Sequence, residues 1–158
     1  MIQDTTGWSL PCMVEVHRRT SAGVNAVWGV LADGWTYPLW VVGASRMRAV
    51  SSDWPAVGAE LHHSLGSWPL LINDTTHVLV SRTGRELKLR GRGWPTGEVE
   101  VQMLLEPTAD GGCEITMRED VAAGPARLLP VPLRHLMMGP RNNESLRRLA
   151  YLTERRSR

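Results

Sequence analysis

Residues 97–121 contain two segments of alternating apolar and polar residues, and they read GEVEVQMLLEPTADGGCEITMREDV. From Val99 to Leu105 every second residue is apolar, which is the period of a half-buried β-strand. The Asp-Gly pair in the connection at 108–112 tolerates positive φ and favours a tight turn. The stretch therefore predicts an antiparallel hairpin with one apolar face and one charged face.

The same alternation predicts further strands on the N-terminal side of this hairpin. They are expected at residues 13–20, 45–50, 59–65, 76–82 and 86–92. Charged side chains of adjacent strands share one face, so we expect ion pairs across the sheet. The residues concerned are Lys88, Arg90, Glu98, Glu100 and Arg118.

Two short helices are expected after the first strand. In residues 21–34 the spacing of Val24, Val27 and Leu31 gathers apolar side chains on one helical face, with Ser21 as a candidate N-cap. A second helical segment is predicted at about 35–40, where a proline is tolerated only in the first turn.

The C-terminal region predicts a helix with one apolar stripe, which includes Leu146 and Leu149. Asn142 or Asn143 is a candidate capping residue at its start. Three prolines precede this point, so we expect the helix to be regular only from about residue 142. The complete order is a strand, two helices, about six strands and a long helix.

Composition favours one cytoplasmic domain over residues 1–158. Eighteen basic and 16 acidic side chains give a net charge of +2, which argues against nucleic acid as a partner. No apolar run approaches the roughly 20 residues of a membrane helix, so no stable membrane insertion is expected. Cys12 and Cys113 are too few for a disulfide framework, and no secretory leader opens the chain. The single lysine beside many arginines and alanines suggests a GC-rich coding genome.

The order of these elements resembles the helix-grip fold of the SRPBCC superfamily, which includes START lipid-transfer domains and pollen-allergen-like proteins. The match is closest to the bacterial polyketide cyclase/dehydrase and lipid-transport branch. It covers nearly the whole chain, and no single motif carries it. The segments concerned are VEVHRRTSAGVNAVWGVLAD, WPAVGAELHHSLGSWP, ITMREDVAAGP and RNNESLRRLAYLTERR.

The resemblance implies an α+β fold in which a curved antiparallel sheet of about seven strands wraps around a long C-terminal helix. It also implies an elongated, mostly apolar cavity that opens near the second short helix. Trp35, Tyr37 and Trp40 occupy that segment and are candidate ligand contacts, although packing against the sheet explains them equally well. Met103 and Met117 share the inward parity and are candidates for the cavity wall.

Glu119 interrupts the apolar face of its strand, because it shares the parity of Ile115 and Met117. The preferred interpretation is a carboxylate that accepts hydrogen bonds from backbone N–H groups or from an arginine of the following helical region. The alternative is a polar anchor for a ligand. His63 also has inward parity, whereas His62 should face solvent, so the pair cannot jointly bind a metal.

The leading hypothesis is therefore a monomer or homodimer that binds a hydrophobic or amphipathic small molecule, such as a lipid, isoprenoid or polyketide. No metal and no cofactor are expected. The first alternative is a polyketide cyclase or dehydratase in which His63 and Glu119 transfer protons. The second is a protein-interaction module whose cavity is filled by its own side chains.

Overall fold

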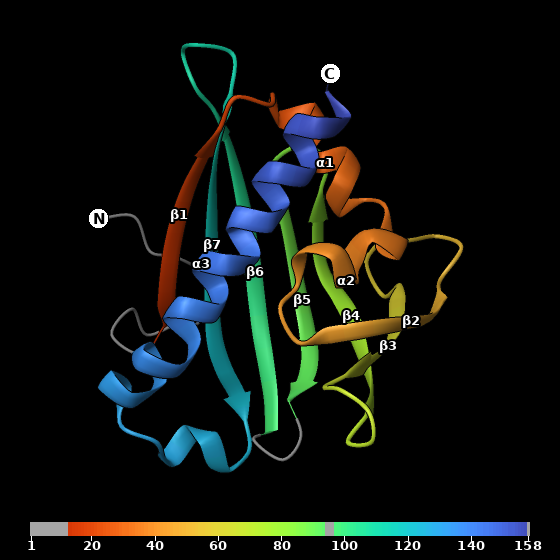
Figure 1. Ribbon diagram of the computed structural model, residues 1–158, viewed down its shortest axis with the longest axis vertical. Helices are drawn as coiled ribbons and strands as arrows, with labels where there is room; N and C mark the ends of the chain where they lie inside the picture. The colour runs from red at the N-terminus through yellow and green to blue at the C-terminus, as the bar shows by residue number, and fades with distance from the viewer. Residues whose placement is uncertain (1–12, 94–96, 158) are drawn as a thin grey trace.

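The computed structural model describes residues 13–93 and 97–157, and its elements follow the predicted order (Figure 1). They are β1 (Val14–Thr20), α1 (Val24–Leu31), η2 (Gly34–Thr36), α2 (Tyr37–Trp40), β2 (Ala44–Val50), β3 (Glu60–Leu65), β4 (Ile72–Arg82), β5 (Glu86–Gly93), β6 (Gly97–Pro107), β7 (Cys113–Ala123), η3 (Pro125–Leu128) and α3 (Val131–Arg156). Cys12 lies outside the described residues. Among those described, no helix combines the length and apolar character that would cross a bilayer.

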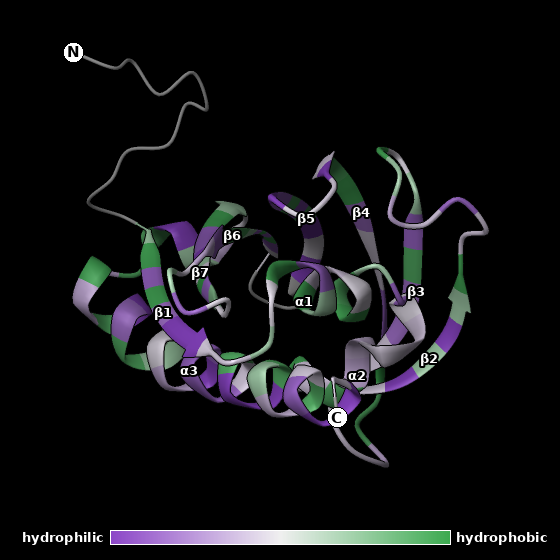
Figure 2. Cartoon of the chain, turned by 90° about the horizontal axis from the view of Figure 1, so that it is seen from above, coloured by the Kyte–Doolittle hydropathy of each residue, from purple (hydrophilic) through white to green (hydrophobic). Residues whose placement is uncertain are grey.

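The seven strands form one antiparallel sheet in the order β1-β7-β6-β5-β4-β3-β2. Seen from above, the strands curve from β1 round to β2, and α3 lies on the concave side of this curve (Figure 2). The short helices α1 and α2 cover the part of the concave side that α3 leaves open, and both contact α3. This is the α+β helix-grip architecture that the sequence predicts.

The alternation in β6 and β7 determines which side chains enter the core. In β7 the buried residues alternate with partly exposed ones along the whole strand, as predicted for a sheet covered on one face. On the opposite face Lys88 Nζ lies 2.9 Å from a Glu100 oxygen, and Arg90 also pairs with Glu100. Arg118 pairs across the sheet with Glu15 of β1, at 2.5 Å.

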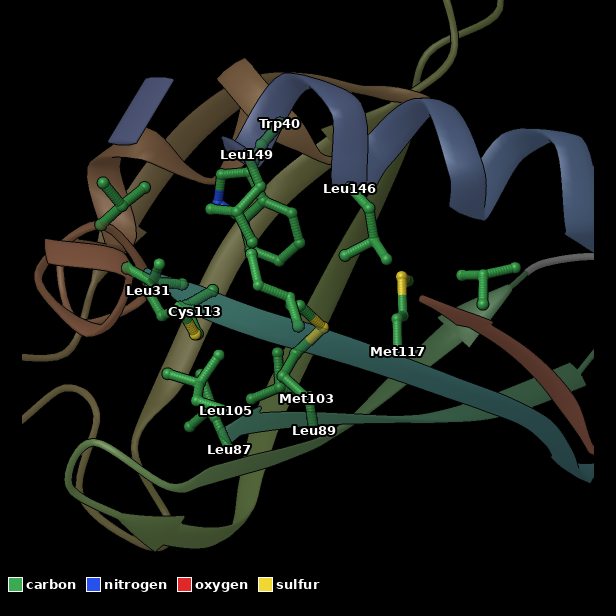
Figure 3. Close-up of a cluster of buried hydrophobic side chains, with 14 of the residues drawn as sticks. Leu31, Trp40, Leu87, Leu89, Met103, Leu105, Cys113, Met117, Leu146 and Leu149 are labelled. Carbon is green, nitrogen blue, oxygen red and sulfur yellow. The ribbon is translucent and has the colours of Figure 1, made fainter. Parts of the chain in front are cut away.

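A packed hydrophobic core fills the space between the sheet and the C-terminal half of α3 (Figure 3). Leu146 and Leu149 of α3 and Trp40 of α2 meet sheet residues that include Leu87 and Met103. Burying a leucine side chain contributes roughly 1.5–3 kcal/mol, so this layer fixes α3 against the sheet.

The predicted helix boundaries are wrong in two places. α3 is continuous from Val131, with Pro130 as N-cap and Pro132 in the first turn, where the missing N–H needs no partner. Asn142 is therefore an interior residue and not a cap, and Pro140 lies inside the helix. The helix α1 has Gly23, not Ser21, as its N-cap.

Candidate ligand-binding cavity

A cavity of about 330 Å³ lies between the sheet and the N-terminal half of α3. Its walls come from α2, the segment after it, the strands β3 to β7, η3 and α3. They comprise Tyr37, Trp40, Val41, Val42, His63, Leu65, Asp74, Thr76, Leu89, Gly91, Arg92, Val99, Val101, Met117, Glu119, Val121, Ala126, Leu129, Arg134, Met137, Met138, Arg141, Asn142 and Ser145. One of these lining residues, Met137, has an exposed side chain.

The apolar face of the sheet divides into a packed part and a part that lines the cavity. Met103 pairs with Leu87 and Met117 across the strands and belongs to the packed core. Two residues earlier in β6, Val101 has the same orientation but lines the cavity. In β5 Gly91 lies close against Thr76, since a Cβ atom there would be 3.0 Å from the threonine hydroxyl oxygen, so a side chain at this position would press on that residue of the wall.

Glu119 is held by an arginine of α3. Its carboxylate is 1% exposed, and both of its oxygens accept hydrogen bonds from Arg141 Nη2. A buried carboxylate is costly without such a partner, so this pair explains how an acid occupies an apolar strand face. The arginine predicted as one possible partner is thus present, although both side chains also line the cavity.

Asn142 and Ser145 follow Arg141 on the same helix and also line the cavity. Asn142 is fully buried, and its Oδ1 accepts a hydrogen bond from Arg141 Nε at 3.3 Å. Its amide nitrogen Nδ2 has no hydrogen-bond partner in the protein. The hydroxyl of Ser145 accepts from the backbone N–H of Val42 at 3.1 Å, which joins α3 to the segment after α2.

His63 occupies the facing wall, on β3. Its ring is 2% exposed, and Nε2 lies 2.9 Å from Thr76 Oγ1 and 3.9 Å from Asp74 Oδ2. The ring centroid of Tyr37 lies 5.0 Å from that of His63, and Tyr37 in turn makes an edge contact with Trp40 at 5.5 Å. The second ring nitrogen, Nδ1, is buried without a partner.

Burial favours the uncharged forms of His63, Tyr37 and Asp74. Burial, with smaller effects from the charges of Arg48 and His62, lowers the pKa of His63 to about 4. Burial likewise raises the pKa of Tyr37 to about 12 and raises the pKa of Asp74 above its usual value. At neutral pH the imidazole is therefore uncharged.

Because the imidazole of His63 is buried in its neutral form, we expect the free energy of unfolding to decrease in acid. The unfolded chain binds a proton at His63 near pH 6.5, whereas the folded chain binds it only near pH 4. Falling pH therefore favours the unfolded state through this window, by up to about 3 kcal/mol from this residue. Urea unfolding at several pH values should reveal the loss in the wild type and a much smaller one in His63→Gln.

Glutamine can keep the hydrogen bond to Thr76 but does not titrate, so it separates protonation from packing. Equal acid sensitivity in the wild type and in His63→Gln would show that His63 does not remain neutral in the folded protein.

The structure brings five of the seven predicted site residues to the cavity. Tyr37, Trp40, His63, Met117 and Glu119 line it. Trp35 does not line it, because its side chain is exposed on the 3-10 helix η2. Met103 does not line it either, because its side chain is enclosed in the packed core.

His62 faces away from the cavity, as its parity predicts. Its Nδ1 lies 3.1 Å from Thr75 Oγ1, and its Nε2 lies 3.1 Å from a carboxylate oxygen of Glu60. Within residues 13–93 and 97–157, no group of three or more His, Cys, Asp or Glu residues is placed to hold a metal ion. Cys113 is a free, buried thiol in the core.

Residues 11–154 match the family model described as "Polyketide cyclase / dehydrase and lipid transport". The chain belongs to this family, which places it in the SRPBCC superfamily. Comparison with the curated proteins finds no match.

Solved structures share the fold at low sequence identity. A START superfamily protein from Mycobacterium smegmatis is 15% identical, with a TM-score of 0.72 over 90% of this chain and 97% of that one. Ara h 8.0201 is 12% identical, with a TM-score of 0.65 over 89% and 96% of the two chains. DynU16, a putative protein in the dynemicin biosynthetic locus, is 19% identical, with a TM-score of 0.67 over 90% of this chain and 47% of that one.

Proposed function

We propose that the protein binds a hydrophobic or amphipathic small molecule in the cavity between the sheet and α3. The observation that carries this proposal is the cavity itself, which has a volume of about 330 Å³ and mostly apolar walls with a few polar groups. Small-molecule sites typically measure about 300–1,000 Å³ and have this composition. The value lies at the lower end of that range, which favours a compact or single-chain ligand.

The ligand contacts follow from the cavity lining. Tyr37, Trp40 and Met117 would supply apolar surface, while His63 and Glu119 would contribute polar atoms among it. Burial of the ligand's apolar surface would drive binding, at about 25 cal/mol per Å² before the costs of association. The family description includes lipid transport, which is consistent with such a ligand.

Binding is favoured over proton-transfer catalysis by the state of the two candidate residues. Both carboxylate oxygens of Glu119 already accept hydrogen bonds from Arg141. A neutral imidazole whose pKa is about 4 is a weak general base at neutral pH. The family description also names cyclase and dehydrase activities, and DynU16 belongs to a biosynthetic locus, so a polyketide remains among the ligands we propose.

A protein-interaction module with a filled interior is disfavoured by the open cavity. The remaining proposals are a cytoplasmic location, a monomer or homodimer, and no nucleic-acid partner. A net charge of +2 spread along the chain is consistent with the last of these.

Isothermal titration with a panel of uncharged isoprenoids, single-chain lipids and aromatic polyketides tests the proposed function. We expect at least one class to bind with one molecule per chain and with a negative heat-capacity change, because apolar surface is buried. Saturating ligand should also raise the unfolding temperature. Absence of binding across the whole panel would contradict the proposal.

A further inference from the structure

Two buried polar atoms on facing walls of the cavity have no hydrogen-bond partner in the protein. Among the described residues three buried side-chain nitrogens lack a partner, and two of them, His63 Nδ1 and Asn142 Nδ2, belong to cavity residues. Folded proteins contain few such atoms, since each costs about 1–3 kcal/mol. The third, Arg18 Nε, belongs to β1 and to no residue of the cavity wall.

The hydrogen bond on the other side of the His63 ring determines what Nδ1 can do. Nε2 lies 2.9 Å from Thr76 Oγ1, and the carboxylate of Asp74 lies 3.9 Å from the same nitrogen. The negative charge favours a proton on Nε2, which then donates to the threonine. In the neutral ring Nδ1 is consequently an acceptor, and it requires a donor such as a hydroxyl group.

The orientation of the Asn142 amide is fixed by its neighbour. Both Nε and Nη2 of Arg141 lie 3.3 Å from Asn142 Oδ1, so this atom is the oxygen and the opposite atom is the NH₂ group. The amide Nδ2 is therefore a donor, and it requires an acceptor such as a carbonyl oxygen.

The cations of the cavity wall are already neutralised or hydrated. Arg141 is paired with Glu119, and Arg134 Nη1 lies 3.5 Å from Asp120 Oδ1. The third arginine of the lining, Arg92, is exposed to solvent. No buried cation is thus left among the described lining residues to bind a carboxylate, and an ionised ligand would lose its hydration without compensation.

Tyr37 connects the two walls. Its ring packs on His63, and its hydroxyl is close enough to Asp74, Glu119 and Arg141 for their charges to affect its ionisation. Tyr37 therefore lies beside charged or polar residues of both walls.

From these contacts, and resting on the function proposed above, we infer that the ligand is uncharged and carries both a hydroxyl group and a carbonyl oxygen on an apolar skeleton. The hydroxyl donates to His63 Nδ1, and the carbonyl oxygen accepts from Asn142 Nδ2. A fatty acid lacks the neutral donor, and a pure hydrocarbon satisfies neither atom.

Four naphthalene derivatives with the same ring system test this inference by titration calorimetry at pH 7.5. They are 6-hydroxy-2-acetonaphthone, 2-acetonaphthone, 2-methylnaphthalene and 2-naphthoate. We expect the hydroxy-ketone to bind about tenfold more tightly than the ketone alone, because one further buried hydrogen bond forms. The methyl compound should be weaker again, and the carboxylate the weakest of the four.

Substitutions of two adjacent asparagines test whether Asn142 binds the carbonyl oxygen of the ligand. Asn142→Leu should weaken binding of both ketones about tenfold while leaving 2-methylnaphthalene unaffected or tighter. Asn143 is exposed on the same turn of α3, so Asn143→Leu is the matched control and should change neither. Asn142→Leu removes only the two 3.3 Å hydrogen bonds from Arg141 to Asn142 Oδ1, and Arg141 keeps its pair with Glu119, so we expect the variant to fold.

The two proposals fail in different ways. Equal affinity for all four compounds, tightest binding of the carboxylate, or unchanged ketone binding in Asn142→Leu would overturn the inferred ligand chemistry and leave a general apolar site intact. If none of the four compounds binds, this inference is contradicted, whereas the function proposed above is contradicted only if the whole ligand panel also fails to bind.

Discussion

Replacing Arg141 by methionine is expected to lower the free energy of unfolding by about 3 kcal/mol at pH 7. The substitution keeps most of the apolar stem but leaves the carboxylate of Glu119, which is 1% exposed, without its partner. Removal of one member of a buried ion pair typically costs about 3–5 kcal/mol, and the partial exposure of Arg141 places this case at the lower end. Urea unfolding followed by tryptophan fluorescence measures the loss.

A second ion pair of α3 provides the control. The side chain of Arg148 is 44% exposed, close to the 43% of Arg141, but the side chain of its partner Glu144 is 32% exposed, against 1% for Glu119. Arg148→Met should therefore be far less destabilising. Equal losses in the two methionine variants would refute this role of Glu119 and Arg141.

Filling the cavity from the sheet is expected to weaken ligand binding by about 100-fold or more. Val101 lies on β6 between Leu89 and Glu119 on the neighbouring strands, and all three line the cavity. A tryptophan at position 101 would occupy space that the ligand needs, and a steric cost of about 3 kcal/mol corresponds to that factor. Titration of the best ligand from the panel gives the affinity directly.

The control for this variant lies on the same strand. Glu98 is on the charged face, so Glu98→Trp adds the same side chain outside the cavity and should preserve binding. Far-ultraviolet circular dichroism of Val101→Trp should match the wild type, since the new ring enters existing space. Normal affinity in a folded Val101→Trp protein would mean that the ligand binds elsewhere.

The strand order and the curved sheet could be predicted from sequence because alternation is a local signal. The β6 segment from Gly97 to Pro107 was predicted to the residue, and the hairpin after it followed from one Asp-Gly pair. The start of α3 differs from the prediction, because prolines usually interrupt a helix and the sequence therefore predicts a later start. Pro130 and Pro132 instead occupy the N-cap and first turn, where a missing N–H has no cost.

The alternation of a strand does not predict whether an inward-facing residue lines the cavity or lies in the packed core. Val101 and Met103 point to the same side of β6, yet the first lines the cavity and the second is packed in the core. That difference depends on which part of α3 crosses each strand, which is a long-range property. The sequence likewise predicts Asn142 or Asn143 as a cap, whereas Asn142 follows the arginine that pairs with Glu119 and lies buried in the cavity wall.

Native mass spectrometry of the wild type and of Val101→Trp, each incubated with the best ligand of the panel, tests the binding cavity most directly. The account predicts one bound molecule per wild-type chain and none on a folded Val101→Trp chain. An adduct of equal abundance on both proteins, or no adduct on the wild type with any ligand, would contradict it.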